Sequence, residues 1–259
     1  MKISVVTPTL NQMDFMPITA RSILEQAGDF DLQWIVMDAG STDGTIDYLN
    51  SIDDPRLRWV SEADEGQSDA INKGLSRADG DVVTWLNSDD LYHPGALDAV
   101  AGHFRSHAES KWLVGRCDIV DVRGNAIRGA ITRYKDRRLD RYRYRQLLRE
   151  NFVSQPAVFW RREFGEQIGP LDTGLYYTMD YDLWLRMGKS CDPFVLGRVI
   201  SSFRWHGGSK TGRLDRRQFD EQYEVACRYL DDDWVSRWNH RLKVERVVWA
   251  YRVMRLLGM

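Results

Sequence analysis

The stretch Thr84-Trp85-Leu86-Asn87-Ser88-Asp89-Asp90 decides the fold. It continues an apolar run from Val82 to Leu86, which is typical of a buried strand, and it ends in polar residues. The carboxyl ends of parallel strands in an open α/β sheet are where ligands bind. Asp89 and Asp90 lie at this end, and adjacent carboxylates suit Mg²⁺ or Mn²⁺ held together with substrate phosphates. The alternative is a turn that caps a helix near Pro94-Gly95.

The composition indicates a folded globular chain. It has 259 residues, of which 43% are hydrophobic and 29% are charged, and this length suits one large α/β domain. The three cysteines lie far apart without CxxC spacing, so a disulfide framework and a cysteine zinc site are both disfavoured. A strand is expected from Ile3, which leaves no room for a signal peptide, and no run of 18 apolar residues occurs. We therefore expect a cytoplasmic protein.

The charge is divided unevenly along the chain. Residues 1–100 contain 18 acidic and 6 basic side chains, and the remaining 159 residues contain 20 acidic and 30 basic ones. The acidic half carries the expected metal site. The basic half indicates an anionic partner, such as a phosphate-bearing acceptor or a membrane surface, or else an ordinary solvated surface.

Strands and helices alternate through the first half, which predicts βαβ units and a mainly parallel sheet. Polar clusters follow each expected strand, so they should meet at one edge. Asp38, at the end of the second strand, can accept hydrogen bonds from a ribose or a base, or it can cap a turn. The expected strands are Lys2–Thr7, Leu32–Met37, Arg56–Ser61 and Val82–Leu86, and the expected helices are Asp14–Gln26 and a short helix that begins at Ser68 and ends near Gly74.

Several nucleotide-binding and hydrolase signatures are missing. The chain has no GxGxxG after its first strand, no GxxxxGK[ST] and no GxSxG. Neither a dinucleotide fingerprint nor a P-loop can therefore hold phosphates, and a metal ion is expected to do so.

Four successive blocks and three later ones resemble family 2 glycosyltransferases with the GT-A fold. The order and spacing of the blocks carry the resemblance, which covers roughly residues 3–210. The blocks are Ser4-Val-Val-Thr-Pro-Thr-Leu-Asn11, Asp38-x-Gly-Ser-Thr-Asp-Gly-Thr45, Asp69-Ala-Ile-Asn-Lys-Gly74, Asn87-Ser-Asp-Asp90, Gln155-Pro156, Gly169-Pro-Leu-Asp172 and Met179-Asp-Tyr-Asp-Leu-Trp-Leu-Arg186.

The resemblance implies an inverting enzyme that moves a sugar from a nucleoside diphosphate sugar to an acceptor hydroxyl. It implies a mixed, mainly parallel sheet flanked by helices over residues 1–213, with a nucleotide half at about 1–100, an acceptor half at about 101–213 and a helical extension at 214–259. The ion would be Mn²⁺ or Mg²⁺. The donor-binding residues implied are Thr7, Pro8, Asn11, Asp38, Asp64, Lys73 and Asp89; the metal ligands are Asp90, which is favoured, Asp89 and His206; the acceptor region includes Gln155 and Asp182.

The general base implied by the resemblance is Asp180. Met179 replaces the family's usual acid just before it, which leaves the choice between Asp180 and Asp182 open. On a helix these two side chains point about 200° apart, so only one should face the site. A structural role at the start of the helix ahead of Leu183 is the alternative for Asp180. His206 lies in the glycine-flanked loop 203–209 after an expected strand, where a neutral imidazole can ligate Mn²⁺.

The rest of the chain leaves alternatives open. The segment 133–149 interleaves cations with tyrosines, which favours an acceptor carrying lipid pyrophosphate or a solvated helix face over nucleic acid. A helix is expected at Leu214–Leu230. The basic aromatic segment 234–257 predicts peripheral contact with the inner membrane face, core packing or a dimer contact. Besides a transferase in polysaccharide or lipid-linked glycan assembly, we considered a nucleotidyltransferase and a catalytically silent sugar-nucleotide-binding scaffold.

Overall fold

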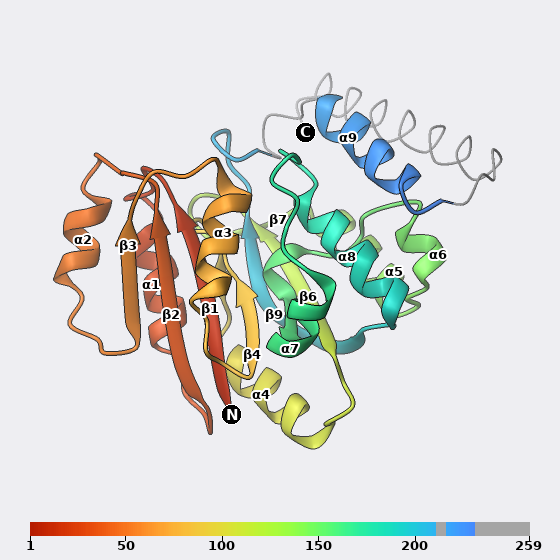
Figure 1. Cartoon of the computed structure of the whole chain (residues 1–259), viewed down its shortest axis with the longest axis horizontal. Coiled ribbons are helices and arrows are strands. Elements are labelled where there is room, and N and C mark those ends of the chain that lie inside the picture. The colour runs from red at the N-terminus through yellow and green to blue at the C-terminus, as the bar shows by residue number, and fades with distance from the viewer. Residues whose placement is uncertain (211–215, 231–259) are drawn as a thin grey trace.

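The computed structural model describes residues 1–210 and 216–230, and Figure 1 shows their arrangement. The expectations for 234–257 and for the extension beyond residue 230 lie outside these ranges. The strands are β1 (Lys2–Thr9), β2 (Asp31–Asp38), β3 (Leu57–Ser61), β4 (Val82–Trp85), β5 (Leu91–Tyr92), β6 (Trp112–Val120), β7 (Ala126–Ile127), β8 (Val158–Arg161) and β9 (Phe194–Arg204). The helices are α1 (Met16–Leu24), α2 (Thr45–Ser51), α3 (Gln67–Ser76), α4 (Ala96–Ser106), α5 (Gly129–Leu139), α6 (Tyr144–Leu147), the 3₁₀ turn η1 (Gln155–Ala157), α7 (Arg162–Ile168), α8 (Met179–Ser190) and α9 (Arg216–Cys227).

The described strands form a mixed sheet in the order β3-β2-β1-β4-β8-β6-β9-β5, with β7 paired to β6. Strands β1 to β4 are parallel to one another, whereas β8 is antiparallel to both β4 and β6. Strand β9 returns parallel to β6. The predicted mixed, mainly parallel architecture is therefore confirmed.

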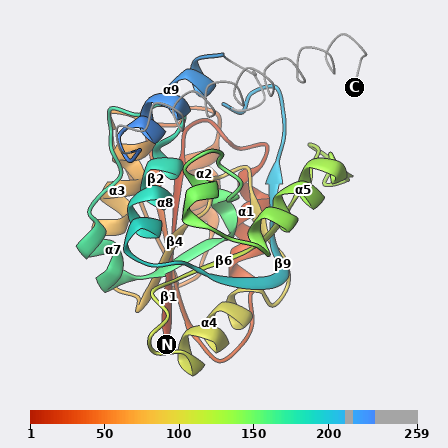
Figure 2. The same cartoon turned by 90° about the vertical axis from the view of Figure 1, so that its right-hand side faces the viewer.

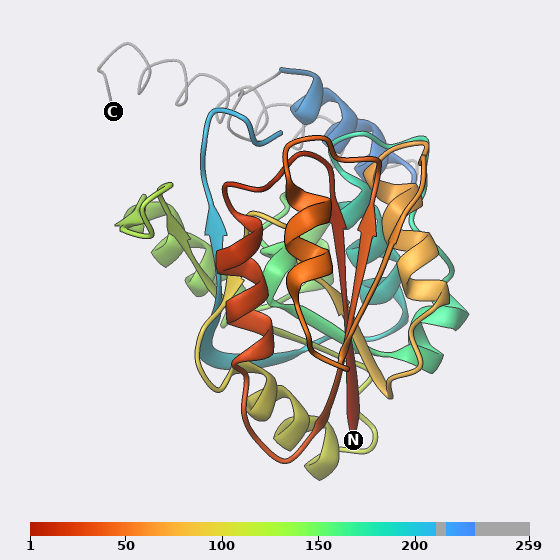
Figure 3. The ribbon, with the colours of Figure 1, turned by 90° about the vertical axis from the view of Figure 1, so that its left-hand side faces the viewer.

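Helices cover both faces of the sheet, which explains why its central strands are apolar on both sides. Along β2, Trp34 and Val36 pack with α1 and α4, and Ile35 and Met37 pack with α3 on the other face. Figures 2 and 3 show α1 and α3 on opposite sides of the strands. Two cores thus hold the strand ends in fixed positions.

Gly74 lies inside α3, and the residues that follow it end the helix at Ser76. A Cβ atom built at Gly74 would come within 2.3 Å of Val6 Cγ1. The glycine is therefore required for close packing of α3 on β1. The helix also begins after Gly66 rather than after Ser68.

A stack of indoles connects the strand that ends in Asp89 and Asp90 to helix α8. The rings of Trp85 and Trp184 are stacked with centroids 5.5 Å apart, and both rings are buried. Such aromatic pairs stabilise by about 1 kcal/mol beyond their buried area. Because Trp184 lies one turn after Asp180, this packing fixes the first turn of α8 relative to β4.

Helix α9, predicted within Leu214–Leu230, packs on α8 (Figure 1). Tyr229 donates a hydrogen bond of 2.6 Å to Asp182, and Arg228 pairs with Asp172 at 2.9 Å. Strand β9 also runs farther than expected, to Arg204, because it continues to pair with β6. These contacts bring the chain after residue 200 back to the carboxyl ends of β1 and β4.

Candidate active site

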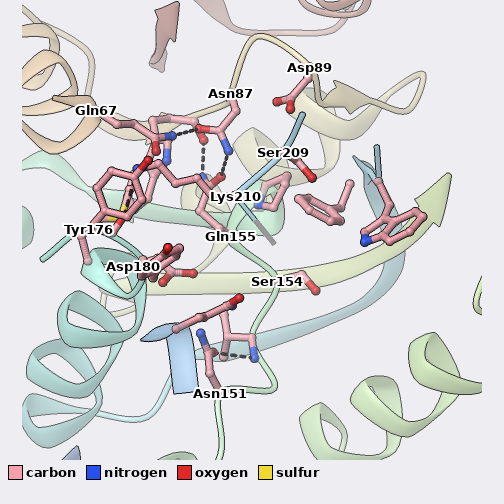
Figure 4. Close-up of a pocket in the computed structure, with 18 of the residues that line it drawn as sticks. Gln67, Asn87, Asp89, Asn151, Ser154, Gln155, Tyr176, Asp180, Ser209 and Lys210 are labelled. Atoms are coloured by element: carbon pink, nitrogen blue, oxygen red, sulfur yellow. Dashed lines mark hydrogen bonds between the residues drawn. The ribbon is translucent and has the colours of Figure 1, made fainter. Parts of the chain in front are cut away.

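A cleft of about 1340 Å³ opens at the carboxyl ends of β1 and β4, and both halves of the chain line it. Figure 4 shows Asp89 and Asp180 around this cleft, together with amide side chains from α3, from the turn after β4 and from η1. Of the residues predicted from sequence, the cleft is lined by Pro8, Asp64, Asp89, Gln155 and Asp180.

Asp38 is buried behind the cleft surface. Its carboxylate accepts hydrogen bonds from the backbone N–H groups of Gly40 (2.9 Å) and Ser41 (3.0 Å), and from the hydroxyl of Ser61 at 2.6 Å. Its neighbour Ala39 lines the cleft instead. In this structure Asp38 therefore shapes the turn after β2, which agrees with the turn-capping alternative rather than with direct exposure to a nucleoside.

Three other predicted donor-binding residues also support the cleft rather than line it. The Thr7 hydroxyl is buried and accepts a 2.9 Å hydrogen bond from the indole of Trp34. Asn11 has a positive φ of 52° and accepts from the Thr42 N–H at 2.8 Å, which joins the loops after β1 and β2. Lys73 pairs with Asp69 at 2.9 Å outside the cleft, and its contact with a donor phosphate stays a prediction.

Asp89 and Asp90 face different surroundings. Asp90 is fully buried and accepts a 2.9 Å hydrogen bond from the Arg204 N–H. Burial, and then the neighbouring Asp89 charge, hold the pKa of Asp90 well above its usual range. Asp89 instead lines the cleft. Asp90 does not line the cleft in this structure, and its role as the direct metal ligand stays a prediction.

The His206 imidazole lies next to the Asp89 carboxylate, as expected if both side chains bind one metal ion. Its Nε2 lies 2.9 Å from Asp89 Oδ2, and its Nδ1 accepts a hydrogen bond from the Gly208 N–H at 3.2 Å. Two protein ligands suit a divalent ion whose remaining positions are taken by diphosphate oxygens. Within residues 1–210 and 216–230, no group of three or more acidic, His or Cys side chains is placed to hold a metal. The residues present thus fit a metal that arrives with the donor.

Amide side chains from three elements form a connected row along the cleft (Figure 4). Gln67 donates to Asn87 Oδ1 at 2.8 Å, Asn87 donates to Gln155 Oε1 at 3.3 Å, and Gln155 donates to the Trp85 carbonyl at 2.7 Å. Gln155 was predicted, whereas Gln67 was not. In the sequence, the only indication of a role for Gln67 is its place in the segment 62–74, which follows a strand and leads into a helix.

Asp180 lines the cleft from the first turn of α8. Burial raises the pKa of its carboxyl to about 6, although hydrogen bonds from the Tyr181 N–H and Asn151, and the charge of Lys135, act in the opposite direction. A carboxylate with a pKa near neutrality is suited to general base chemistry.

Asp182 faces away from the cleft, which corrects its placement in the acceptor region. It is 3% exposed, pairs with Arg186 at 2.9 Å and accepts the Tyr229 hydroxyl at 2.6 Å. Of the two candidate bases, Asp180 alone lines the cleft, as the helical period predicted for one of them.

Glu221 of α9 holds the start of α8, and sequence reasoning did not find it. Its carboxylate accepts the backbone N–H groups of Tyr176 (3.1 Å), Tyr177 (2.8 Å) and Thr178 (2.7 Å). It also accepts the Thr178 hydroxyl at 2.7 Å. An acidic side chain at a helix N-terminus satisfies donors that lack partners in the helix. Glu221 therefore fixes the turn that carries Asp180.

No helix within residues 1–210 and 216–230 has the length and apolar composition needed to cross a bilayer.

Comparisons with known proteins agree with this geometry. The chain is 31% identical over 224 residues to a PGL/p-HBAD biosynthesis glycosyltransferase of Mycobacterium bovis. This match covers 82% of this chain and 80% of the relative. Its fold is similar to that of S. aureus TarS 1–349 in complex with UDP-GlcNAc, with a TM-score of 0.66, 16% identity and coverage of 90% and 68% of the two chains. A mannosyltransferase from Pyrobaculum calidifontis, in complex with GDP-Man and Mn²⁺, gives a TM-score of 0.66 at 19% identity and covers 95% and 69%. A family model described as glycosyl transferase family 2 matches residues 4–166. The chain therefore belongs to glycosyl transferase family 2, and the protein is a glycosyltransferase.

Proposed function

We propose that the protein transfers a sugar, with inversion, from a nucleoside diphosphate sugar to an acceptor hydroxyl, with Asp180 as the general base. The observation that carries the proposal is that Asp180, with its pKa raised to about 6, shares one cleft with Asp89. The acceptor oxygen attacks the anomeric carbon while Asp180 takes its proton, and the nucleoside diphosphate departs with the electrons of the broken bond. A catalytically silent scaffold would not need a cleft-lining carboxyl group with a pKa near neutrality.

Asp89 and His206 are the residues that would hold a divalent ion in the cleft. Such an ion, when bound, supplies positive charge to the diphosphate as it leaves. Asp90 supports this pair from behind, because its bond to the Arg204 N–H fixes β9 two residues before His206. The Mn²⁺ in the structurally similar mannosyltransferase supports a metal here, and Mg²⁺ has the same ligand preference.

The donor is proposed as a class, a nucleoside diphosphate sugar. The two similar structures contain UDP-GlcNAc and GDP-Man, which differ in both base and sugar. For the acceptor we propose a phosphate-bearing or lipid-linked glycan of the cell surface, met on the cytoplasmic side of the membrane. The excess of basic residues after residue 100 and the cleft-lining Lys135 and Arg149 support this choice.

Binding and turnover test the proposal separately. A nucleoside diphosphate that binds only the folded state should raise the melting temperature, and the shift should require Mn²⁺ or Mg²⁺. Release of UDP or GDP from nucleotide sugars should then be measured for the wild type and for Asp180→Asn. The silent scaffold is favoured if a nucleotide binds with metal but the wild type and the variant release product equally slowly.

A further inference from the structure

Helix α5 places an ammonium group in the cleft without a counterion in contact. Lys135 lines the cleft, and its Nζ donates a hydrogen bond of 3.2 Å to the Ser154 hydroxyl. Among its contacts to the described residues there is no ion pair. Withdrawing an ammonium group from water is unfavourable unless hydrogen bonds or nearby negative charges stabilise it. Burial accordingly lowers the pKa of Lys135, and the charges of Asp180, Glu150 and Asp136 oppose that shift.

Lys135 and Asp180 are held by one short segment of chain. Ser154 accepts the hydrogen bond from Lys135, and three residues earlier the Asn151 side chain hydrogen-bonds to Asp180. Asn151 Oδ1 accepts the Val153 N–H at 3.2 Å, so the Nδ2 group is the one that can donate to Asp180. Figure 4 shows Asn151, Ser154 and Asp180 around the same part of the cleft. Segment 151–154 therefore sets the positions of both charged groups.

The charged neighbours of Asp180 differ in how firmly they are engaged elsewhere. Lys210 donates a 2.9 Å hydrogen bond to the Tyr176 carbonyl, lies over the Tyr176 ring and is acted on by the charges of Glu221 and Asp180. On α8 itself, the Tyr181 N–H donates to the Asp180 carboxylate at 2.7 Å. The charge of Lys135 acts on Asp180 against the effect of burial, and among the described residues its ammonium hydrogen-bonds only to the Ser154 hydroxyl.

We propose that Lys135 is a positioning residue for the base: its ammonium keeps Asp180 ionised inside the cleft, and Ser154 keeps the ammonium in place. The proposal rests on the proposed function of Asp180. Lys135 stays protonated throughout, the acceptor hydroxyl gives its proton to Asp180, and the new bond to the sugar forms as the diphosphate leaves. Because the charge acts through Asp180, Lys135 need not touch the substrate.

The test compares Lys135→Met, which keeps the length of the side chain without its charge, with Lys135→Arg. Loss of a cation near a carboxylate raises the carboxyl pKa, by about 1 unit or more. Activity needs ionised Asp180, so the acid limb of the pH profile should move to higher pH in Lys135→Met. The rate below that limb should fall roughly tenfold, the rate well above it should change little, and Lys135→Arg should keep the wild-type profile.

Lys189→Met is the matched control, because Lys189 is an exposed lysine near the end of α8 and does not line the cleft. Its pH profile should equal that of the wild type, and circular dichroism should show that all variants are folded. An unmoved acid limb in Lys135→Met, or an equal shift in Lys189→Met, overturns the proposal.

Direct titration separates this proposal from the proposed function. The Asp180 carboxyl can be followed by NMR of protein carrying ¹³C-labelled aspartate, with Asp180→Asn to assign the signal, and no substrate is needed. A higher carboxyl pKa in Lys135→Met supports the proposal even if the donor is unknown, and an unchanged pKa overturns it. A shifted carboxyl pKa with an unshifted pH profile overturns the role of Asp180 as base and, with it, the catalytic role of Lys135.

Discussion

His206 Nε2 lies 2.9 Å from Asp89 Oδ2, although the two residues are 117 positions apart in the chain. Strand β9 makes this meeting possible, because it returns beside β6 and ends at Arg204, whose N–H binds Asp90. One carboxylate of the adjacent pair thus anchors the strand, and the other lines the cleft and contacts the histidine.

The different roles of the two carboxylates can be tested by exchanging each for an amide. Asp89→Asn should weaken metal-dependent binding of nucleoside diphosphates by about 10-fold or more, because a charged ligand is lost. Asp90→Asn keeps an oxygen that can accept the Arg204 N–H, so binding should stay within a few-fold of the wild type. Calorimetric titration of UDP and GDP with and without Mn²⁺ measures both. Equal losses of affinity in the two variants would indicate that Asp90 also binds the metal.

The pKa of Asp180 predicts how activity depends on pH. Burial raises this pKa to about 6, and only the ionised carboxylate can take a proton. The rate should therefore be at its plateau above about pH 7 and should fall roughly tenfold per pH unit below 6. A profile of kcat/KM measured from pH 4.5 to 8.5 checks this. A flat profile across that range would contradict Asp180 as the base.

Asp180→Asn should mainly lower activity, whereas Asp182→Asn should mainly lower stability. The first removes the base and should lower kcat roughly 10²- to 10⁴-fold with little effect on stability. The second weakens the contacts to Arg186 and Tyr229 and should destabilise the fold by about 1–3 kcal/mol, while the folded enzyme keeps its activity. Urea unfolding and steady-state rates measure the two effects. Full activity in Asp180→Asn would assign the base elsewhere.

Removing Glu221 should affect transfer more than donor binding. In Glu221→Ala the N–H groups of Tyr176, Tyr177 and Thr178 lose their acceptor, which costs about 0.5–2 kcal/mol for a helix cap. The turn that carries Asp180 is then less well fixed, so kcat should fall, whereas nucleotide affinity should not. Glu224→Ala, on the same helix, is the control. Unchanged kcat in Glu221→Ala would show that the cap serves only stability.

Gly74→Ala tests the contact between α3 and β1. The added methyl group would meet Val6 Cγ1 at 2.3 Å, and such overpacking should lower the free energy of unfolding by about 1–3 kcal/mol. Gly102→Ala in α4 has open space around it and should stabilise by up to about 1 kcal/mol. Thermal unfolding of both variants measures the difference. Shortening Val6 to Ala should restore part of the loss in Gly74→Ala.

The sequence predicted those features that depend on local pattern. Buried strands followed by polar clusters placed Pro8 and Asp89 at one edge, and the helical period separated Asp180 from Asp182. The resemblance favoured Asp90 over Asp89, but it could not show that Asp90 is buried, because that burial depends on the backbone of Arg204, more than 100 residues away.

The residues that were missed share the same physical cause. Gln67 and Glu221 act through partners far away in the chain, and neither lies in a pattern that a window of sequence can show. Lys135 was noticed only as one cation among many in the segment 133–149. Unlike most of the others it is half-buried, and it lines the cleft from α5.

The bond between Glu221 and the start of α8 also sets an order during synthesis on the ribosome. Strands β1 to β4 leave the ribosome before α9, which carries the carboxylate that caps α8. The turn that carries Asp180 therefore cannot gain this cap until α9 has been made.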